Sequence, residues 1–285
     1  MPVTIRQLTL LISPMNPKPM SMSIPGAIII AAAILAIAII YARKPAPVTP
    51  ITDDAEKVVI SIAPITSADH IFGNPNASIK IVEFSDPSCP YCKIFHPTMR
   101  TLMDQYGPAG NVAWVYRAFP LDKPDPQGNI LHPNAGRESQ AIECAGGLGG
   151  NDAFWKYVNR LYEITPSVTG ASPEGLDQKE LPNIAKFAGL DVVAFNECLT
   201  SERFKDKIEA QYLDGVNAGV SGTPSNVLVL SKPALASLDL VLKTLTAKYG
   251  VPVLISDDRL KIFMPGALPI EALKDVIDPL LVAMK

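Results

Sequence analysis

The sequence has no stripe of basic residues and no acidic tail, and its formal net charge is only −3. Proteins that bind nucleic acids gather positive charge to neutralise phosphates, so a role of this kind has no electrostatic basis here. No segment of the 285 residues repeats at a fixed period, which excludes solenoids and propellers. The length allows one or two domains with a sizeable core.

Cysteine and histidine are also scarce, with four and three residues respectively. A zinc ribbon needs two closely spaced cysteine pairs, but Cys89 and Cys92 form the one such pair in the sequence. The histidines lack ligand spacing and stand far apart, at His70, His96 and His132. These absences argue against a metal site, and nothing in the sequence requires a soluble cofactor.

A long hydrophobic run is present near the N-terminus. No charged residue occurs over the 19 positions of residues 24–42, and a helix of that length matches a hydrocarbon core of about 30 Å. A cleaved signal peptide is the alternative, but the run is long for such a peptide and no small-x-small cleavage site follows it. We therefore predict a transmembrane anchor at 24–42, preceded by a tail at 1–23. Basic residues on both sides leave the orientation of the anchor open.

Residues 43–55 are rich in proline and show no apolar period. Such a segment is extended and semi-rigid. We expect it to link the anchor to a single domain at residues 56–285, so the membrane is the first partner that the sequence predicts.

The cysteine pair lies in the stretch SDPSCPYCK, residues 85–93, between a predicted strand and a predicted helix. Residues 78–84 are apolar and rich in β-branched side chains, which is typical of a short strand buried on both faces. Apolar side chains then recur with helical spacing until Gly107. Residues 111–119 have the pattern of a second strand, so the three elements predict a parallel βαβ unit.

The rest of the domain is predicted to contain a helical block and a second β-region. Residues 121–133 form a proline-rich loop, and residues 226–230 have the pattern of a strand. A hairpin with its turn at Asp257 and Asp258 is expected further along. Helices are expected over residues 134–148, 152–162, 178–188, 192–199, 201–217, 235–249 and 269–284. The fold class is therefore α/β, with β-rich ends around a helical block.

The position of Cys89 bears on three interpretations of the pair, which are a metal site, a structural disulfide and an exchanging redox pair. A disulfide across a two-residue gap constrains the unfolded chain little and is readily reduced. Cys89 lies where the helix begins, and Pro90 suits the first helical position because no N–H is needed there. The unpaired amides and the positive end of the helix dipole favour a thiolate at Cys89. Cys92 follows almost one turn later, which favours the redox pair.

Four stretches of the sequence carry a resemblance to a known family. They are DHIFGNPNASIKIVEFSDPSCPYC, VYRAFPL, HPNAGRESQAIECA and GVSGTPS. Together they resemble the DsbA-like thioredoxin-fold thiol:disulfide oxidoreductases over about residues 65–224. The resemblance implies a thioredoxin-like fold with an inserted α-helical domain, here at about residues 122–218. The sequence departs from the family at about residues 231–257, where we expect an extra insertion.

The resemblance also implies roles around Cys89 and Cys92, the expected catalytic pair. It implies that Pro224 is a cis-proline against the two cysteines and that Thr223 and Pro224 bind an extended substrate chain. Glu83 resembles the carboxylate that family members place beneath the second cysteine, where burial raises the pKa and fits it to take the Cys92 proton. The alternative is a Glu83 side chain that points to solvent.

Three further residues lie in the motif or shortly after it. Pro90 and Tyr91 are expected to contact substrate and to tune the redox potential through packing and hydrogen bonding at the helix start. We expect His96 to be an exposed helix residue rather than a catalytic base.

Cys144 and Cys198 lie in separate predicted helices of the inserted block, 54 positions apart. Two buried free thiols are one alternative. If the domain lies outside the cytoplasm, oxidising conditions favour a second, structural disulfide between them.

These features predict a membrane-tethered, extracytoplasmic thiol:disulfide oxidoreductase. The resemblance implies that the Cys89–Cys92 disulfide is donated to reduced or misoxidised secreted or envelope proteins, and that a membrane quinone-linked thiol oxidase, DsbB-like or VKOR-like, restores it. Three alternatives stay open: a reductase or isomerase of the same fold, a non-catalytic tethered chaperone, and a metal carrier. No soluble cofactor, metal or nucleic acid is expected.

Overall fold

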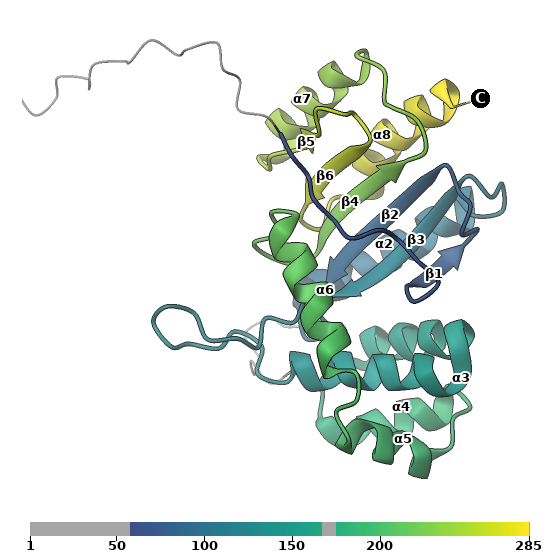
Figure 1. Ribbon diagram of the computed structural model, residues 1–285, viewed down its shortest axis with the longest axis vertical. Helices are drawn as coiled ribbons and strands as arrows, with labels where there is room; N and C mark the ends of the chain where they lie inside the picture. The colour runs from purple at the N-terminus through teal and green to yellow at the C-terminus, as the bar shows by residue number, and fades with distance from the viewer. Residues whose placement is uncertain (1–57, 167–174, 285) are drawn as a thin grey trace, which may run out of the picture. The chain divides into compact units, whose positions relative to one another are not determined.

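The computed structural model of the chain describes residues 58–166 and 175–284. Its centre is one six-stranded sheet in the order β1-β3-β2-β4-β6-β5 (Figure 1). The strands are β1 (His70–Gly73), β2 (Ile79–Ser85), β3 (Val112–Ala118), β4 (Ser225–Leu230), β5 (Leu254–Ile255) and β6 (Lys261–Pro265). The predicted anchor at 24–42 and the predicted linker at 43–55 lie outside the described residues.

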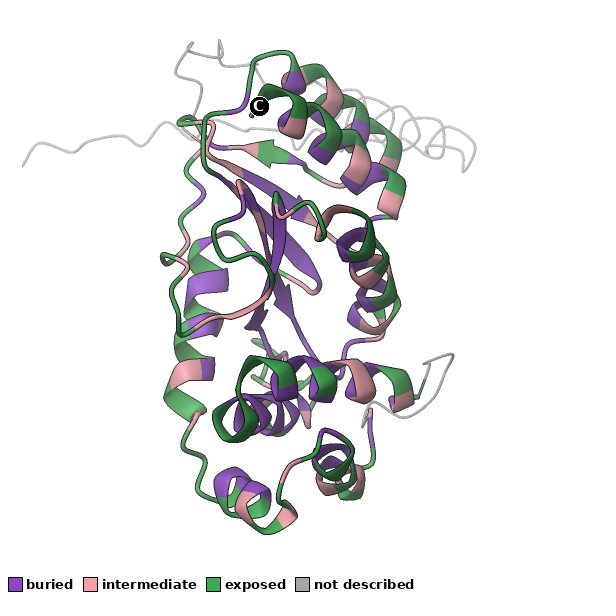
Figure 2. Cartoon of the chain, turned by 90° about the vertical axis from the view of Figure 1, so that its right-hand side faces the viewer, coloured by how far each residue is buried: buried purple, intermediate pink, exposed green. Residues whose placement is uncertain are grey.

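The βαβ unit predicted around the cysteine pair is confirmed. Strand β2 runs parallel to β3, and α2 (Pro90–Tyr106) connects them. Both strands are almost entirely buried (Figure 2), in agreement with their apolar, β-branched composition. Strand β1, which pairs antiparallel with β3, was not predicted, because it has only four residues, none of them buried, and shows no periodicity to detect.

The predicted helical block lies between β3 and β4 in the chain. It consists of α3 (Ala135–Ile164), a 3₁₀ turn η1 (Gln178–Glu180), α4 (Leu181–Phe187), α5 (Val192–Thr200) and α6 (Lys205–Asn217). Helices α4 and α5 pack on α3, whereas α6 leads back along β3 (Figure 1). The two helices predicted at 134–148 and 152–162 form one element that bends at Gly150, where the φ of 70° favours glycine.

The segment at 231–257 adds structure to the far edge of the sheet. It contains α7 (Leu238–Tyr249) and the short edge strand β5. Strand β5 pairs antiparallel with β6, so the hairpin predicted with its turn at Asp257 and Asp258 is present. Helix α8 (Ile270–Ala283) follows β6.

Two apolar clusters fill the two faces of the sheet. The larger one includes Met99 and Leu102 of α2 and Trp114 of β3, and the smaller one includes Phe84 and Phe119. Because α2 is held by this packing, the start of the helix, which carries the cysteine pair, has a defined position at the end of β2.

Candidate redox site

Cys89 caps the N-terminus of α2 in an extended conformation, and Pro90 occupies the first turn. The pKa of the Cys89 thiol is lowered to about 6, because the hydrogen bond from the Cys92 side chain outweighs burial. The Thr223 side chain and the backbone N–H of Cys92 lower this pKa further. A helix amide thus stabilises the Cys89 thiolate, as predicted. The largest single cause of the lowered pKa, however, is the hydrogen bond from the Cys92 thiol.

Cys92 differs sharply from Cys89 in its surroundings. Its side chain is fully buried, and burial raises its pKa well above 9.0. The backbone N–H of Asp86 donates to Cys92 Sγ at 3.4 Å. Both cysteines are free thiols in this structure, so the pair consists of one acidic thiol and one thiol that holds its proton.

Glu83 lies in β2 with no exposed surface. Its carboxylate accepts hydrogen bonds from Ser85 Oγ at 2.6 Å and from Trp114 Nε1 at 2.9 Å. Burial nevertheless raises the Glu83 pKa to about 7, and the charge of Glu83 contributes to the raised pKa of Cys92. The expectation of a buried carboxyl near Cys92 is confirmed, and the solvent-facing alternative is wrong.

The loop before β4 brings Thr223 and Pro224 to the cysteines. The peptide bond between these two residues is cis, as expected. Cys89 Sγ donates to the Thr223 carbonyl oxygen at 3.3 Å. Tyr91 is 63% exposed and Ile94 is 64% exposed, so two large apolar side chains close to the cysteines in the chain are open to solvent.

The expectation of an exposed His96 is wrong, because this side chain is buried. Helix α2 packs on the sheet with a wide stripe that includes the adjacent positions Phe95 and His96. His96 Nε2 lies 2.7 Å from Asn159 Oδ1, and its ring contacts Trp114. Burial lowers the His96 pKa to about 4, so the imidazole is neutral near pH 7.

Sequence reasoning missed a buried polar cluster behind Cys89. The cluster comprises the buried residues Asp86, Ser88, His132 and Glu138 together with the half-buried Gln178. His132 Nδ1 lies 2.8 Å from Asp86 Oδ2, and Ser88 Oγ donates to Glu138 Oε2 at 2.7 Å. Gln178 Nε2 donates to the other Glu138 oxygen at 2.9 Å. His132 and Glu138 both belong to the HPNAGRE stretch, whose local pattern carries no sign of contact with the cysteine loop.

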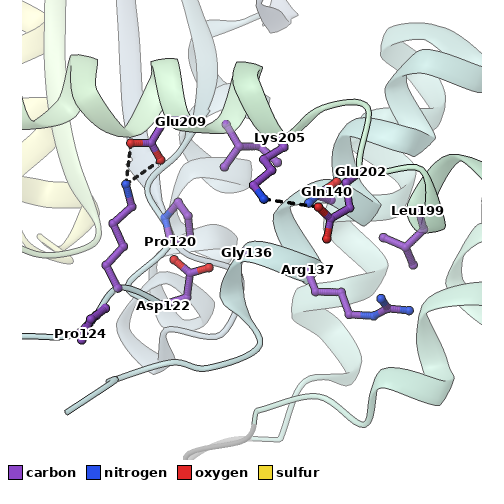
Figure 3. Close-up of a pocket in the computed structure, with 12 residues that line it drawn as sticks. Pro120, Asp122, Pro124, Gly136, Arg137, Gln140, Leu199, Glu202, Lys205 and Glu209 are labelled. Carbon is purple, nitrogen blue, oxygen red and sulfur yellow. Dashed lines mark hydrogen bonds and ion pairs between the residues drawn. The ribbon is translucent and has the colours of Figure 1, made fainter. Parts of the chain in front are cut away.

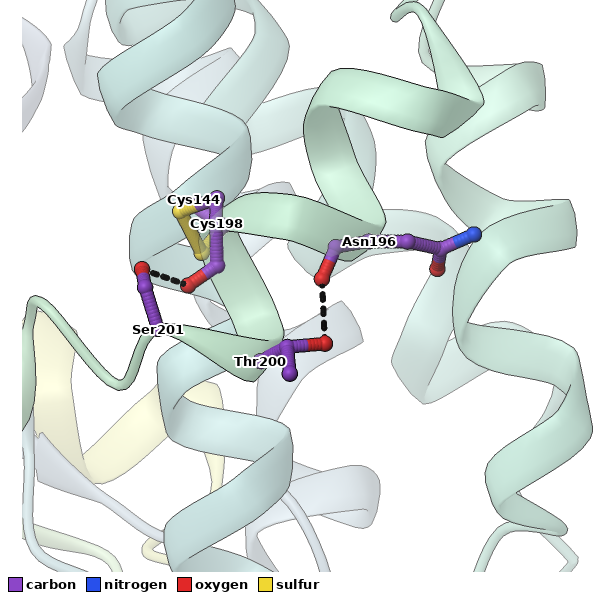
Figure 4. The surroundings of a disulfide bond; sticks show 5 residues. All are labelled: Cys144, Asn196, Cys198, Thr200 and Ser201. Carbon is purple, nitrogen blue, oxygen red and sulfur yellow. Dashed lines mark hydrogen bonds between the residues drawn. A yellow bond between two sulfur atoms is a disulfide. The ribbon is translucent and has the colours of Figure 1, made fainter.

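Cys144 of α3 and Cys198 of α5 form a disulfide (Figure 4). The expected bridge is therefore present, and the alternative of two free thiols is wrong. It joins two helices of the inserted block at the point where they pack together.

A cavity of about 470 Å³ lies between the loop after β3 and the helices α3 and α6 (Figure 3). Its charged side chains largely pair with one another: Lys123 bonds Glu209, and Lys205 bonds Glu202. None of the predicted site residues lines it, so we assign it no ligand.

Within residues 58–166 and 175–284, no three histidine, cysteine or acidic side chains gather into a possible metal site. The same residues contain no helix with the length and apolar character that a membrane crossing needs.

A family model described as thioredoxin matches residues 66–229, more than half of the chain. The chain belongs to the thioredoxin family. Among solved structures, it is similar to α-DsbA1 of Wolbachia pipientis, with a TM-score of 0.55 and 19% identity over 76% of this chain and 94% of that one. This likeness shows a DsbA-like thioredoxin fold, with helices inserted between β3 and β4.

Two curated relatives each match more than half of this thioredoxin-family chain. The probable disulfide bond formation protein D of Bacillus anthracis is 26% identical over 165 residues, which are 56% of this chain and 69% of that protein. A Na⁺/H⁺ antiporter NhaA 1 of Salinispora arenicola is 30% identical over 173 residues, which are 60% of this chain but 23% of the antiporter. The chain thus spans less than a quarter of the antiporter's length.

Proposed function

We propose that this protein is an extracytoplasmic thiol:disulfide oxidoreductase that introduces disulfides into other proteins through Cys89 and Cys92. The observation that carries the proposal is the contrast between the two thiols. Cys89 caps α2 beside the Thr223 carbonyl oxygen, whereas Cys92 is fully buried, and the pKa of Cys89 is lowered to about 6 while that of Cys92 is raised. A thiolate is both the attacking and the better leaving species in disulfide exchange. The name of the related Bacillus anthracis protein supports the same chemistry.

The proposed cycle starts with the Cys89–Cys92 disulfide. A substrate thiolate attacks Cys89 Sγ, the bond between the two sulfurs breaks, and Cys92 leaves as a thiolate. Glu83, protonated below about pH 7, gives its proton to Cys92. A second substrate thiolate then attacks the substrate sulfur of the mixed disulfide and releases Cys89 as a thiolate. The substrate loses two electrons and two protons. The cysteine pair gains the two electrons, one proton replaces the one that Glu83 gave to Cys92, and the other goes to solvent.

The surroundings of the pair suit a substrate chain. The backbone at Thr223 and Pro224 lies against Cys89 Sγ, while Tyr91 and Ile94 are exposed beside it. These groups offer backbone hydrogen bonds and apolar contact without demanding one sequence. Thr223 and Pro224, together with Tyr91 and Pro90, form the proposed substrate site.

The direction of exchange follows from how strongly the thiolate is stabilised, since a stable thiolate favours the reduced pair and makes the disulfide a stronger oxidant. A Cys89 pKa of about 6 lies between those of thioredoxin, about 7, and DsbA, about 3.5. We therefore expect a reduction potential between about −270 mV and about −120 mV. A value close to −270 mV would favour the alternative, a reductase or isomerase.

A trapping experiment tests the function directly. The Cys92→Ala variant should accumulate mixed disulfides through Cys89 in cells, because Cys92 is no longer present to attack the mixed disulfide in the reverse step, whereas Cys89→Ser should accumulate none. Oxidised protein should also oxidise a reduced model substrate with two cysteines. Failure of both assays would leave a non-catalytic chaperone as the better description.

The location and the reoxidising partner are part of the same proposal. The Cys144–Cys198 disulfide supports an oxidising compartment, and residues 24–42 support a single-pass anchor in the cell membrane. A membrane quinone-linked thiol oxidase of the DsbB or VKOR type would regenerate the disulfide. Protease added to intact spheroplasts should digest the domain at residues 56–285; protection from the protease would contradict this topology.

A further inference from the structure

The Cys-Pro-Tyr-Cys motif places no charged side chain between its cysteines, but the carboxylate of Asp86 lies three positions before Cys89. Asp86 is fully buried and contacts both cysteines through its backbone. Its N–H donates to Cys92 Sγ at 3.4 Å, and its carbonyl oxygen accepts from the Cys89 N–H at 3.0 Å. The Asp86 carboxylate raises the pKa of both thiols and by itself opposes the thiolate.

His132 is the hydrogen-bonding partner of this carboxylate. Its Nδ1 lies 2.8 Å from Asp86 Oδ2, and the residue is 8% exposed. The Asp86 carboxylate is held in place by two backbone donors, since the Ser88 N–H bonds Oδ1 at 2.7 Å and the Leu121 N–H bonds Oδ2 at 2.8 Å. The imidazole is thus fixed behind the loop that carries Cys89.

Charges on three elements act on His132. They are Asp86 after β2, Cys89 at the start of α2 and Glu138 in α3. Burial opposes protonation, but the hydrogen bond and the negative charges outweigh it and raise the His132 pKa above 6.5. Since such coupling is reciprocal, a group that is more easily protonated beside the Cys89 thiolate must also stabilise that thiolate.

We propose that His132 is a positioning residue for Cys89: while protonated, it offsets the Asp86 carboxylate behind the two sulfurs and thereby favours the Cys89 thiolate. The inference rests on the proposed function, in which that thiolate is the leaving and attacking group. The loop at residues 121–133, which carries His132, would then help to set the reduction potential of the cysteine pair. The oxidising strength of the pair should therefore fall as the pH rises and His132 loses its proton.

A titration of the unmodified full-length protein tests this coupling without any substitution. The pKa of His132, followed by the NMR shifts of its ring, should be higher in the reduced protein than in the oxidised protein, because the disulfide carries no charge. His70, which pairs with Glu143 and Lys207, serves as an internal control, and its ring shifts should follow the same curve in both redox states. Equal His132 pKa values in the two states would overturn the inference.

The variant His132→Gln adds a second measurement. Removing the cation should raise the pKa of Cys89 by about half to one pH unit, which lowers the thiolate fraction near pH 6 about twofold to fivefold. Ultraviolet thiolate absorbance reports this fraction, with Cys89→Ser to assign the signal. The matched control His70→Gln should leave the titration unchanged, and His132→Lys should restore part of the thiolate.

The outcomes separate this inference from the function itself. If Cys89 titrates identically in His132→Gln and in the unmodified protein while substrate oxidation continues, the role of His132 is wrong and the function stands. If Cys89 of the unmodified protein titrates as an ordinary thiol and forms no mixed disulfides, the proposed function itself is wrong.

Discussion

The carboxyl group of Glu83 has a pKa of about 7 in its buried site, close to the working pH of a proton donor for Cys92. Replacing Glu83 by Gln keeps the shape of the side chain but removes the titrating group. We expect substrate oxidation by Glu83→Gln to slow by about 10²-fold or more near neutral pH. The fall in rate that the unmodified protein shows as the pH rises through about 7 should disappear in the variant.

Stopped-flow exchange with a model dithiol over a pH series measures both effects. The control is Glu209→Gln, which alters an exposed carboxylate paired with Lys123 and should leave the profile unchanged. An unaltered pH profile in Glu83→Gln would mean that another group protonates Cys92.

Single residues also show where local sequence is a poor guide. His96 has a polar side chain of the kind expected at the surface, yet it lies in the core against Trp114. Its burial depends on how wide a stripe of α2 the sheet covers. The width of this stripe is set by the packing of the helix against the sheet and not by the helix sequence alone.

At the scale of elements, the return of α6 along the sheet depends on close contact at Gly215. A Cβ at this position would lie 2.5 Å from Phe119 Cδ2 and 2.9 Å from Phe84 Cδ1, closer than packed carbons approach. We expect Gly215→Ala to lower the free energy of unfolding by about 1–3 kcal/mol.

Denaturant unfolding measures this change. The matched control is Gly222→Ala, because a Cβ there meets nothing within 4 Å and its φ is not positive; its effect should stay within about 0.5 kcal/mol. If Gly215→Ala is as stable as the control, α6 has room to move away from the sheet.

At the scale of the whole molecule, the Cys89 thiolate links redox state to stability. Its folded pKa of about 6 is below the ordinary value of 9.0, so the reduced folded protein binds fewer protons than the unfolded chain between these values. The stabilisation is present above about pH 9 and is lost as the pH falls to about 6. The oxidised protein has no such contribution, because its Cys89 cannot ionise.

We therefore expect the difference in free energy of unfolding, reduced minus oxidised, to grow as the pH rises from about 6 to about 9. Glu83 and Glu138 act in the opposite direction: their folded pKa values of about 7 give a stabilisation that is present below 4.5 and lost as the pH rises through about 7. Both glutamates are present in both redox states, so their effect largely cancels in the difference. Denaturant unfolding of the reduced and oxidised forms over this pH range measures the difference in the free energy of unfolding. A difference that stays constant with pH would contradict the lowered pKa of Cys89.

Most of the chemistry around the motif was predictable because it is local. Pro90 begins a helix directly after Cys89, and the apolar patterns of β2, α2 and β3 follow from the exposure of each face. The resemblance added Glu83, Thr223 and Pro224, whose geometry agrees with expectation, while their roles stay proposals.

The sequence by itself determined where the redox pair stands, because a helix start and a buried parallel strand are set by neighbouring residues. Only the tertiary structure decided which charges surround that pair. Asp86 and His132 are 46 positions apart, and Ser88 and Glu138 are 50 positions apart. Contacts between such distant positions exist only once the helical block has packed against the sheet, so no local pattern encodes them.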